Sequence, residues 1–158
     1  MSCKDHDFNC VCEAVRNIAD LQDAVEDNCP TSCFSNLLNP AFAPGRDTIP
    51  FILYTKKGKP FTAFGNIRPN QVANPVVGMN AFKTPFFRVN NVDGCCATLE
   101  LLESNVEPDC KKDVEEIICG TERLFRTGNC IEVDLKCFCA IQCLTPELVQ
   151  ANTGQFRR

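Results

Sequence analysis

The clearest strand pattern in this chain is Cys130-Ile131-Glu132-Val133-Asp134-Leu135-Lys136-Cys137-Phe138-Cys139-Ala140-Ile141. Because successive side chains of a strand point to opposite faces, the alternation predicts one apolar and one polar face. The apolar face would hold Ile131, Val133, Leu135, Cys137, Cys139 and Ile141, and the polar face Cys130, Glu132, Asp134 and Lys136. We therefore expect Cys137 and Cys139 to be buried and Cys130 to be exposed.

Shorter runs of β-branched and aromatic residues predict further strands upstream. These runs cover residues 49–55, 60–65, 84–92 and 95–102, with a weaker one at 114–119, and the last strand extends over 130–144. Lys56-Lys57-Gly58-Lys59 separates the first two runs and predicts a hairpin turn. Residues 66–83 are rich in Asn, Pro and Gly and predict a long loop. Thr145 before Pro146 predicts one last helical turn.

One helix is expected near the N-terminus, over residues 11–28. Its apolar positions recur at helical spacing and form one stripe, Val11, Val15, Ile18, Leu21 and Val25. Pro30 would end this helix. The expected fold is therefore mainly β with one N-terminal amphipathic helix (α+β), built as an antiparallel β-sandwich or a barrel-like core.

The same patterns predict a single globular domain over residues 11–158. Its β core would span about residues 49–144 and be followed by a short C-terminal tail. Residues 1–10 are mostly polar and predict a flexible arm that carries Cys3, His6 and Cys10. Thiols on such a tether could reach a neighbouring molecule.

Thirteen cysteines in 158 residues make cross-linking the first functional hypothesis. Such a density is typical of exported disulfide scaffolds, yet the chain opens without the apolar leader of a secretory signal. We therefore expect synthesis in a reducing cytoplasm, with oxidation after release from the cell. Because the count is odd, at least one thiol must stay free, bind a metal or pair with another molecule.

Several other functions are disfavoured by what the chain contains. No stretch is apolar enough to cross a bilayer. The net charge of −4, with no lysine or arginine cluster larger than a pair, disfavours a nucleic-acid partner. The chain has one histidine, no phosphate-binding glycine loop and no Cys-x-x-Cys motif, so we expect no enzymatic activity.

The cysteines divide into two groups by their expected role. Candidates for disulfides between molecules are Cys3, Cys10, Cys12, Cys95, Cys96 and Cys130. Candidates for the core or for an internal disulfide are Cys29, Cys33, Cys137, Cys139 and Cys143. For Cys137 and Cys139, core packing, an internal disulfide and metal ligation all remain open. A zinc site at Cys3, His6, Cys10 and Cys12 is an alternative for the arm, although its spacing departs from the usual paired knuckles.

Blocks of sequence from almost the whole chain resemble the CotY/CotZ family of Bacillus spore surface proteins. The most specific block is residues 130–144. The others are Met1-Ser2-Cys3, Asn9-Cys10-Val11-Cys12-Glu13-Ala14-Val15, Cys29-Pro30-Thr31-Ser32-Cys33, Asn36-Leu37-Leu38, Asp47-Thr48-Ile49-Pro50-Phe51, Ala63-Phe64-Gly65-Asn66, Phe87-Arg88-Val89 and Cys96-Ala97-Thr98-Leu99. Residues 67–83 and 103–129 carry no such landmark. The cysteine-rich opening and the length are more similar to the CotY branch of the family than to the CotZ branch.

The resemblance implies a structural protein of the spore crust or of the exosporium basal layer. Such proteins are made in the mother-cell cytoplasm and self-assemble into hexagonally ordered sheets, which disulfides then reinforce. The implied partners are further copies of the chain, most simply in a hexamer, and other spore coat proteins including family paralogues. No enzymatic activity and no cofactor is implied.

Overall fold

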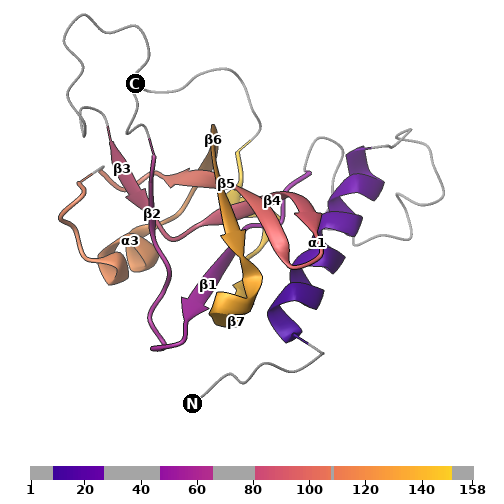
Figure 1. The fold of residues 1–158 in the computed structure, drawn as a ribbon. Helices are drawn as coiled ribbons and strands as arrows, with labels where there is room; N and C mark the ends of the chain where they lie inside the picture. The colour runs from indigo at the N-terminus through magenta and orange to yellow at the C-terminus, as the bar shows by residue number, and fades with distance from the viewer. Residues whose placement is uncertain (1–8, 27–46, 66–80, 108, 151–158) are drawn as a thin grey trace, which may run out of the picture.

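The computed structural model describes residues 9–26, 47–65, 81–107 and 109–150 (Figure 1). Two α-helices, two short 3-10 turns and seven strands lie within these residues. The helices are α1 (Cys10–Glu26) and α3 (Val114–Gly120), and the 3-10 turns are η1 (Leu135–Cys137) and η2 (Pro146–Leu148). The strands are β1 (Phe51–Thr55), β2 (Ala63–Gly65), β3 (Phe82–Thr84), β4 (Phe87–Asp93), β5 (Cys96–Ser104), β6 (Leu124–Asp134) and β7 (Phe138–Cys143). The expectation of a mainly β chain with an N-terminal helix is confirmed.

Five of the strands form one antiparallel sheet in the order β6-β5-β4-β1-β7, and β2 pairs with β3 separately. All pairings in the larger sheet are antiparallel. β6 and β7 are its two edge strands, so the sheet is open and the barrel alternative is wrong. The predicted turn at 56–59 is present: Gly58 has a φ of 79°, and Tyr54 pairs with Pro60 across it.

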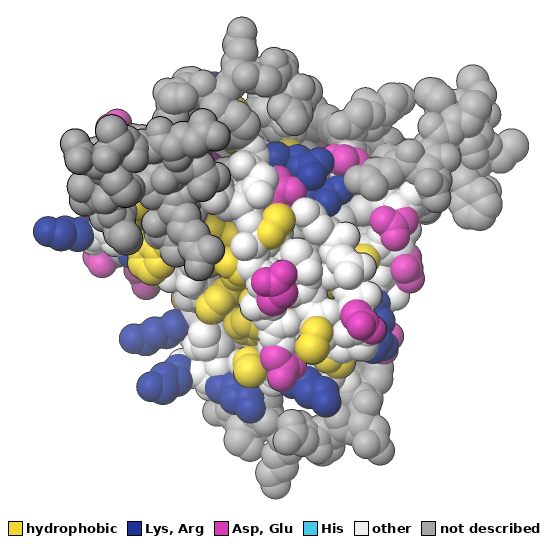
Figure 2. Space-filling view, turned by 45° about the horizontal axis from the view of Figure 1, so that its top comes forward, with side chains coloured by type: hydrophobic (Ala, Val, Ile, Leu, Met, Phe, Trp, Pro, Cys, Tyr) yellow, Lys and Arg dark blue, Asp and Glu magenta, His cyan; other side chains and the backbone are white. Residues whose placement is uncertain are grey.

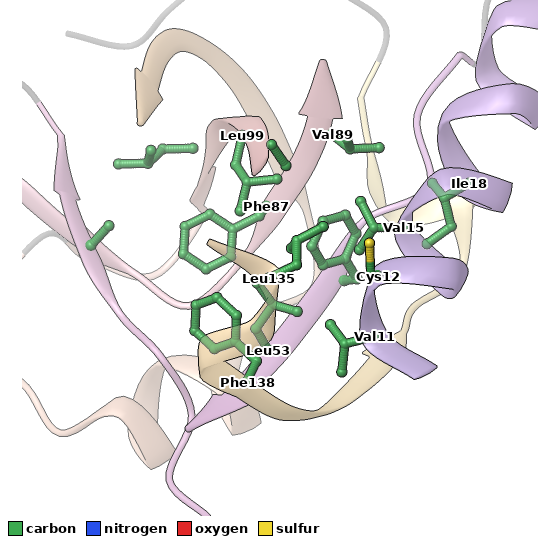
Figure 3. Close-up of a cluster of buried hydrophobic side chains, with 14 of the residues drawn as sticks. Val11, Cys12, Val15, Ile18, Leu53, Phe87, Val89, Leu99, Leu135 and Phe138 are labelled. Atoms are coloured by element: carbon green, nitrogen blue, oxygen red, sulfur yellow. The ribbon is translucent and has the colours of Figure 1, made fainter. Parts of the chain in front are cut away.

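Helix α1 packs its apolar stripe on one face of the larger sheet. Figure 3 shows Val11, Cys12, Val15 and Ile18 directed from the helix towards the strands. They join a core that includes Phe51, Leu53, Phe87, Val89, Ala97, Leu99, Leu101, Leu135 and Phe138. The start of the helix is capped by Asn9, whose side-chain oxygen accepts a hydrogen bond from the backbone N of Cys12 at 2.9 Å. Of the predicted range 11–28, the last two residues lie outside the described part.

The buried Gln22 fixes this helix to the chain beside it. Its amide nitrogen donates to the carbonyl of Val89 at 2.8 Å, and its side-chain oxygen accepts from the backbone N of Ile49 at 3.0 Å. Both polar ends of a buried side chain are thus satisfied. One residue therefore joins α1, β4 and the segment that enters β1.

The second helix, α3, corrects one of the expected strands. Residues 114–119 had predicted a weak strand, but Val114, Ile117 and Ile118 also fit helical spacing, and Glu115 and Glu116 favour a helix N-terminus. Ile117 packs in a second core on the other side of the sheet. The other buried members of that core are Ile52, Phe86, Leu102, Leu124 and Val149.

The expected strand at 130–144 is two strands with a turn between them. The side chain of Asp134 accepts a hydrogen bond from the backbone N of Lys136 at 2.9 Å, and this local bond favours the 3-10 turn η1. The alternation is lost at this turn, so Leu135 is buried while Cys137 is exposed. β6 also begins earlier than expected, at Leu124. The predicted loop 66–83 includes the start of β3, and its residues 66–80 lie outside the described part.

Candidate cross-linking thiols

The described surface carries seven free cysteines, and all of them are exposed. They lie on α1, on the strands β5, β6 and β7, in η1, on α3 and in the segment before α3. They are Cys10, Cys96, Cys110, Cys119, Cys130, Cys137 and Cys143. Exposed thiols on separate elements can meet thiols of other molecules in several directions, whereas a core would hide them.

Cys12 and Cys95 form an internal disulfide, so the expectation that they link different molecules is wrong. Their Cα atoms are 5.4 Å apart, and the bridge joins α1 to the turn between β4 and β5. Cys12 is only 1% exposed because it lies on the buried stripe of the helix, three residues before Val15. Arg16 strengthens the same junction by donating from Nε and Nη2 to the carbonyl of Gly94 at 3.1 and 2.9 Å.

The other predicted thiols are placed as follows. Cys10, Cys96 and Cys130 are exposed and free. Cys10 is the first residue of α1, and residues 1–8 of the predicted arm lie outside the described part. Cys137 and Cys143 are also exposed and free, contrary to their expected place in the core or in an internal disulfide. Cys139 is half-buried and disulfide-bonded. Cys3, His6, Cys29 and Cys33 lie outside the described residues.

Two exposed thiols lie in a segment without a family landmark, and one ligand of the alternative zinc set is in a disulfide. Cys110 and Cys119 were not singled out, since the segment around them carries no recognised landmark, yet both are accessible. The alternative zinc set needs Cys12 as a thiolate ligand, and a disulfide sulfur cannot serve as one while the bridge is intact. Within the described ranges no group of three potential metal ligands comes together.

Cys96 and Cys130 lie on the same face of the larger sheet. The register pairs Asp93 on β4 with Cys96 on β5, and Cys96 in turn with Asp134 on β6. Residues directly opposite each other in an antiparallel pair share a face. Since Ala97 is buried among the core side chains that pack against α1, the neighbouring Cys96 points away from that core.

Beside Cys130, this face carries a network of charged side chains around Glu100. Two nitrogen atoms of the Arg126 guanidinium bind the carboxylate of Glu100. Nη2 donates to Oε1 at 2.8 Å, and Nε donates to Oε2 at 3.1 Å. Asn90 also donates to Glu100 at 3.2 Å. Arg126 and Arg88 both contact the carboxylate of Asp47, at 3.2 and 3.4 Å. The network therefore ties β6, β5 and β4 to the chain before β1.

The surroundings of Cys130 disfavour its thiolate. Burial raises the pKa of the Cys130 thiol, and the negative charges of Glu100 and Glu132 raise it further. Thiolate is the nucleophile in thiol chemistry, so Cys130 reacts more slowly at neutral pH than an ordinary thiol of the same access. Burial raises the pKa of Cys143 as well.

We expect alkylation of Cys130 by iodoacetamide to show a pH midpoint above the value of about 8.5 for a free thiol. Replacing Glu132→Gln removes one neighbouring charge and should lower that midpoint. Peptide mass spectrometry across a pH series measures the rate for Cys130 alone. A midpoint at or below the free-thiol value, or one unmoved in the variant, would contradict this account.

None of the described helices is long and apolar enough to cross a membrane. The chemistry that the described site can perform is disulfide formation between exposed thiols of different molecules. That reaction needs accessible sulfur atoms, an oxidant and an interface that holds two chains together.

Comparison with known proteins gives a family for the chain. The model of the family "Spore coat protein Z" matches residues 1–146. Spore coat protein Z of Bacillus subtilis (strain 168) is 48% identical over 143 residues, which cover 89% of this chain and 92% of that protein. No solved structure matches the chain. Both matches carry the Z name, so they add no support for the CotY branch within the expected CotY/CotZ family.

Proposed function

The chain belongs to the spore coat protein Z family, and from this we propose its function in detail. Membership supports a structural role in the spore coat and a place at the spore surface. We propose that the protein is made in the mother-cell cytoplasm and forms part of the outermost layer, either the crust or the basal layer of the exosporium. A catalytic role is not part of the proposal, because the family is one of structural coat proteins.

In this proposal the protein self-assembles into hexagonal two-dimensional sheets that intermolecular disulfides reinforce. The single observation that carries it is the division of the cysteines. A disulfide joins Cys12 to Cys95 within the fold and Cys139 is also disulfide-bonded, while seven free thiols lie exposed on different elements of the described chain. A lone globular chain gains nothing from exposed thiols, whereas neighbouring copies in a sheet can be joined by them.

Non-covalent contacts must come first in such an assembly. Disulfides do not persist in a reducing cytoplasm, so the interfaces must form while the thiols are reduced. The partners are copies of the same chain, and a repeated contact between two different surfaces closes a ring such as a hexamer. Other spore coat proteins, family paralogues included, are proposed as partners of the same sheet.

We expect the purified protein to form ordered sheets in the presence of reductant. A variant with serine at the seven exposed positions, and with the other six cysteines retained, should form the same sheets, because the fold and the interfaces remain. After oxidation, only the parent should resist boiling in detergent without reductant. Electron microscopy and non-reducing gels measure the two properties.

Two results would contradict the proposal. The first is a parent protein that stays monomeric at all concentrations reached. The second is a serine variant that keeps the full heat resistance of the oxidised parent. The control is a variant with serine at two of the seven positions, which should lose only part of that resistance, since many bonds must break before a sheet disassembles.

A further inference from the structure

An uncovered acidic face lies on β4, β5 and β6. In the register of the sheet, Cys96 on β5 lies between Asp93 on β4 and Asp134 on β6. In the next row of the same face, Thr98 on β5 lies opposite Glu132 on β6. Asp93, Glu132 and Asp134 are exposed, and in the described chain none of them is part of an ion pair. The acidic face, defined by these three carboxylates, therefore surrounds the free thiol of Cys96 with negative charge.

A basic corner lies at the end of β1. Lys56, Lys57 and Lys59 in the turn after β1 are all exposed. Thr55 pairs with Phe138, so the preceding residues Lys136 and Cys137 come close to this turn, as the neighbouring positions of β1 and β7 in Figure 1 show. We call the four lysines the basic corner; within the described ranges they make no ion pair, and the free thiol of Cys137 lies beside them.

The acidic face and the basic corner are neighbouring areas of opposite sign, since Lys136 of the corner lies two residues after Asp134 of the face. In Figure 2, Lys and Arg side chains project along the lower left of the molecule, and acidic side chains lie over its centre, right side and left edge, with further basic side chains among them. Two acidic faces repel each other, and so do two basic corners. A contact between copies that joins unlike areas is favoured by charge complementarity.

We propose that the basic corner of one copy docks on the acidic face of a second copy. The inference rests on the proposed self-assembly and names one of its interfaces. Four lysines then meet three carboxylates. The free thiol of Cys96 lies among the carboxylates of the acidic face, and the free thiol of Cys137 lies beside the lysines of the basic corner. Docking therefore brings Cys137 of one copy towards Cys96 of the other.

The covalent step that follows is an exchange with a small-molecule disulfide such as oxidised glutathione. Cys137 and Cys96 each lose their S–H bond and form one S–S bond between the two copies. The disulfide of the glutathione breaks, and its two sulfur atoms take up the two protons and two electrons as two reduced thiols. The protein sulfurs are oxidised and the glutathione is reduced, so the step balances.

Charge reversal tests the docking. One variant carries Lys56→Glu, Lys57→Glu and Lys59→Glu, and the other carries Asp93→Lys and Glu132→Lys. Asp134 is left unchanged because it caps η1. Each exposed ion pair contributes little to the free energy of association, but several pairs in one interface add up. Each variant alone should therefore need a protein concentration at least about tenfold above that of the parent to form sheets.

An equimolar mixture of the two variants should assemble at the concentration of the parent. In the mixture, each altered surface meets a partner of opposite charge, and alternation of the two chains suits a ring with an even number of members. Controls carry charge reversals near or on α3: Lys111→Glu with Lys112→Glu reverses two lysines against three in the corner variant, and Glu115→Lys with Glu116→Lys makes the same change of charge as the acidic-face variant. These controls should assemble like the parent.

Mass spectrometry of the parent, oxidised with glutathione disulfide, should find peptides that link Cys96 to Cys137. Cys96→Ser should lose this cross-link, while Cys119→Ser should keep it. Sheets that form equally well from all the variants, or a mixture that fails to recover, would overturn this interface and leave the proposed function standing. A parent that forms no sheets would overturn both.

Discussion

Replacing Cys95→Ala is expected to lower the free energy of unfolding by about 4.5 kcal/mol, the value that chain entropy predicts for so long a loop. The bridge closes a loop between residues 83 positions apart. It restricts the unfolded chain, and in the folded state it holds α1 against the turn between β4 and β5. Cys95 is the better position to change, because replacement of the fully buried Cys12 would also disturb packing.

Urea unfolding measures this loss, with Cys119→Ala as the matched control at an exposed, free cysteine. The control should unfold like the parent. In excess reductant the difference between parent and Cys95→Ala should disappear, since the bridge is then absent from both. A loss that persists in reductant would show that the side chain acts through packing rather than through the disulfide.

The second large effect is expected at Glu100, where Glu100→Ala should lower the free energy of unfolding by about 2–3 kcal/mol, the range for losing hydrogen bonds between charged groups. Glu100 is 2% exposed and is bound at both carboxylate oxygens by Arg126. Removal of the carboxylate leaves Arg126 without this partner. The backbone N of Gly128 donates to Glu100 at 3.3 Å, so it is left unsatisfied as well. The exposed Glu122→Ala, between α3 and β6, is the matched control and should change little.

The same carboxylate makes stability depend on pH. Burial raises the pKa of Glu100, but the ion pair with Arg126 and the hydrogen bonds from Asn90 and Gly128 outweigh it, so the pKa lies below its usual value. The charged form is thus bound more strongly in the folded state. Its contribution is complete above the unfolded pKa of about 4.3 and is lost as the pH falls through the lower folded pKa.

The difference in unfolding free energy between the parent and Glu100→Gln should therefore be constant near neutral pH and shrink in acid. Urea titrations from about pH 7 to pH 3 test the sign. A difference that grows as the pH falls would mean that the pKa of Glu100 is raised in the folded protein.

Local features of the fold could be predicted from the sequence because they depend on neighbouring residues. The stripe of α1, the turn around Gly58 and the strands at 51–55 and 96–104 follow from periodicity and turn chemistry within a few residues. The resemblance to a spore coat family also depends on the sequence alone, and the comparisons confirmed it. The exposure of Cys130 followed from the alternation of β6.

Other features were decided only by tertiary structure, because they join residues distant in the chain. The strand order β6-β5-β4-β1-β7 depends on which edges meet after the cores form. Cys12 and Cys95 pair because packing of α1 on the sheet brings their Cα atoms to 5.4 Å, and no local pattern encodes that distance. Cys137 lies outside the core since a side-chain bond from Asp134 turns the chain where alternation alone predicts a continuous strand.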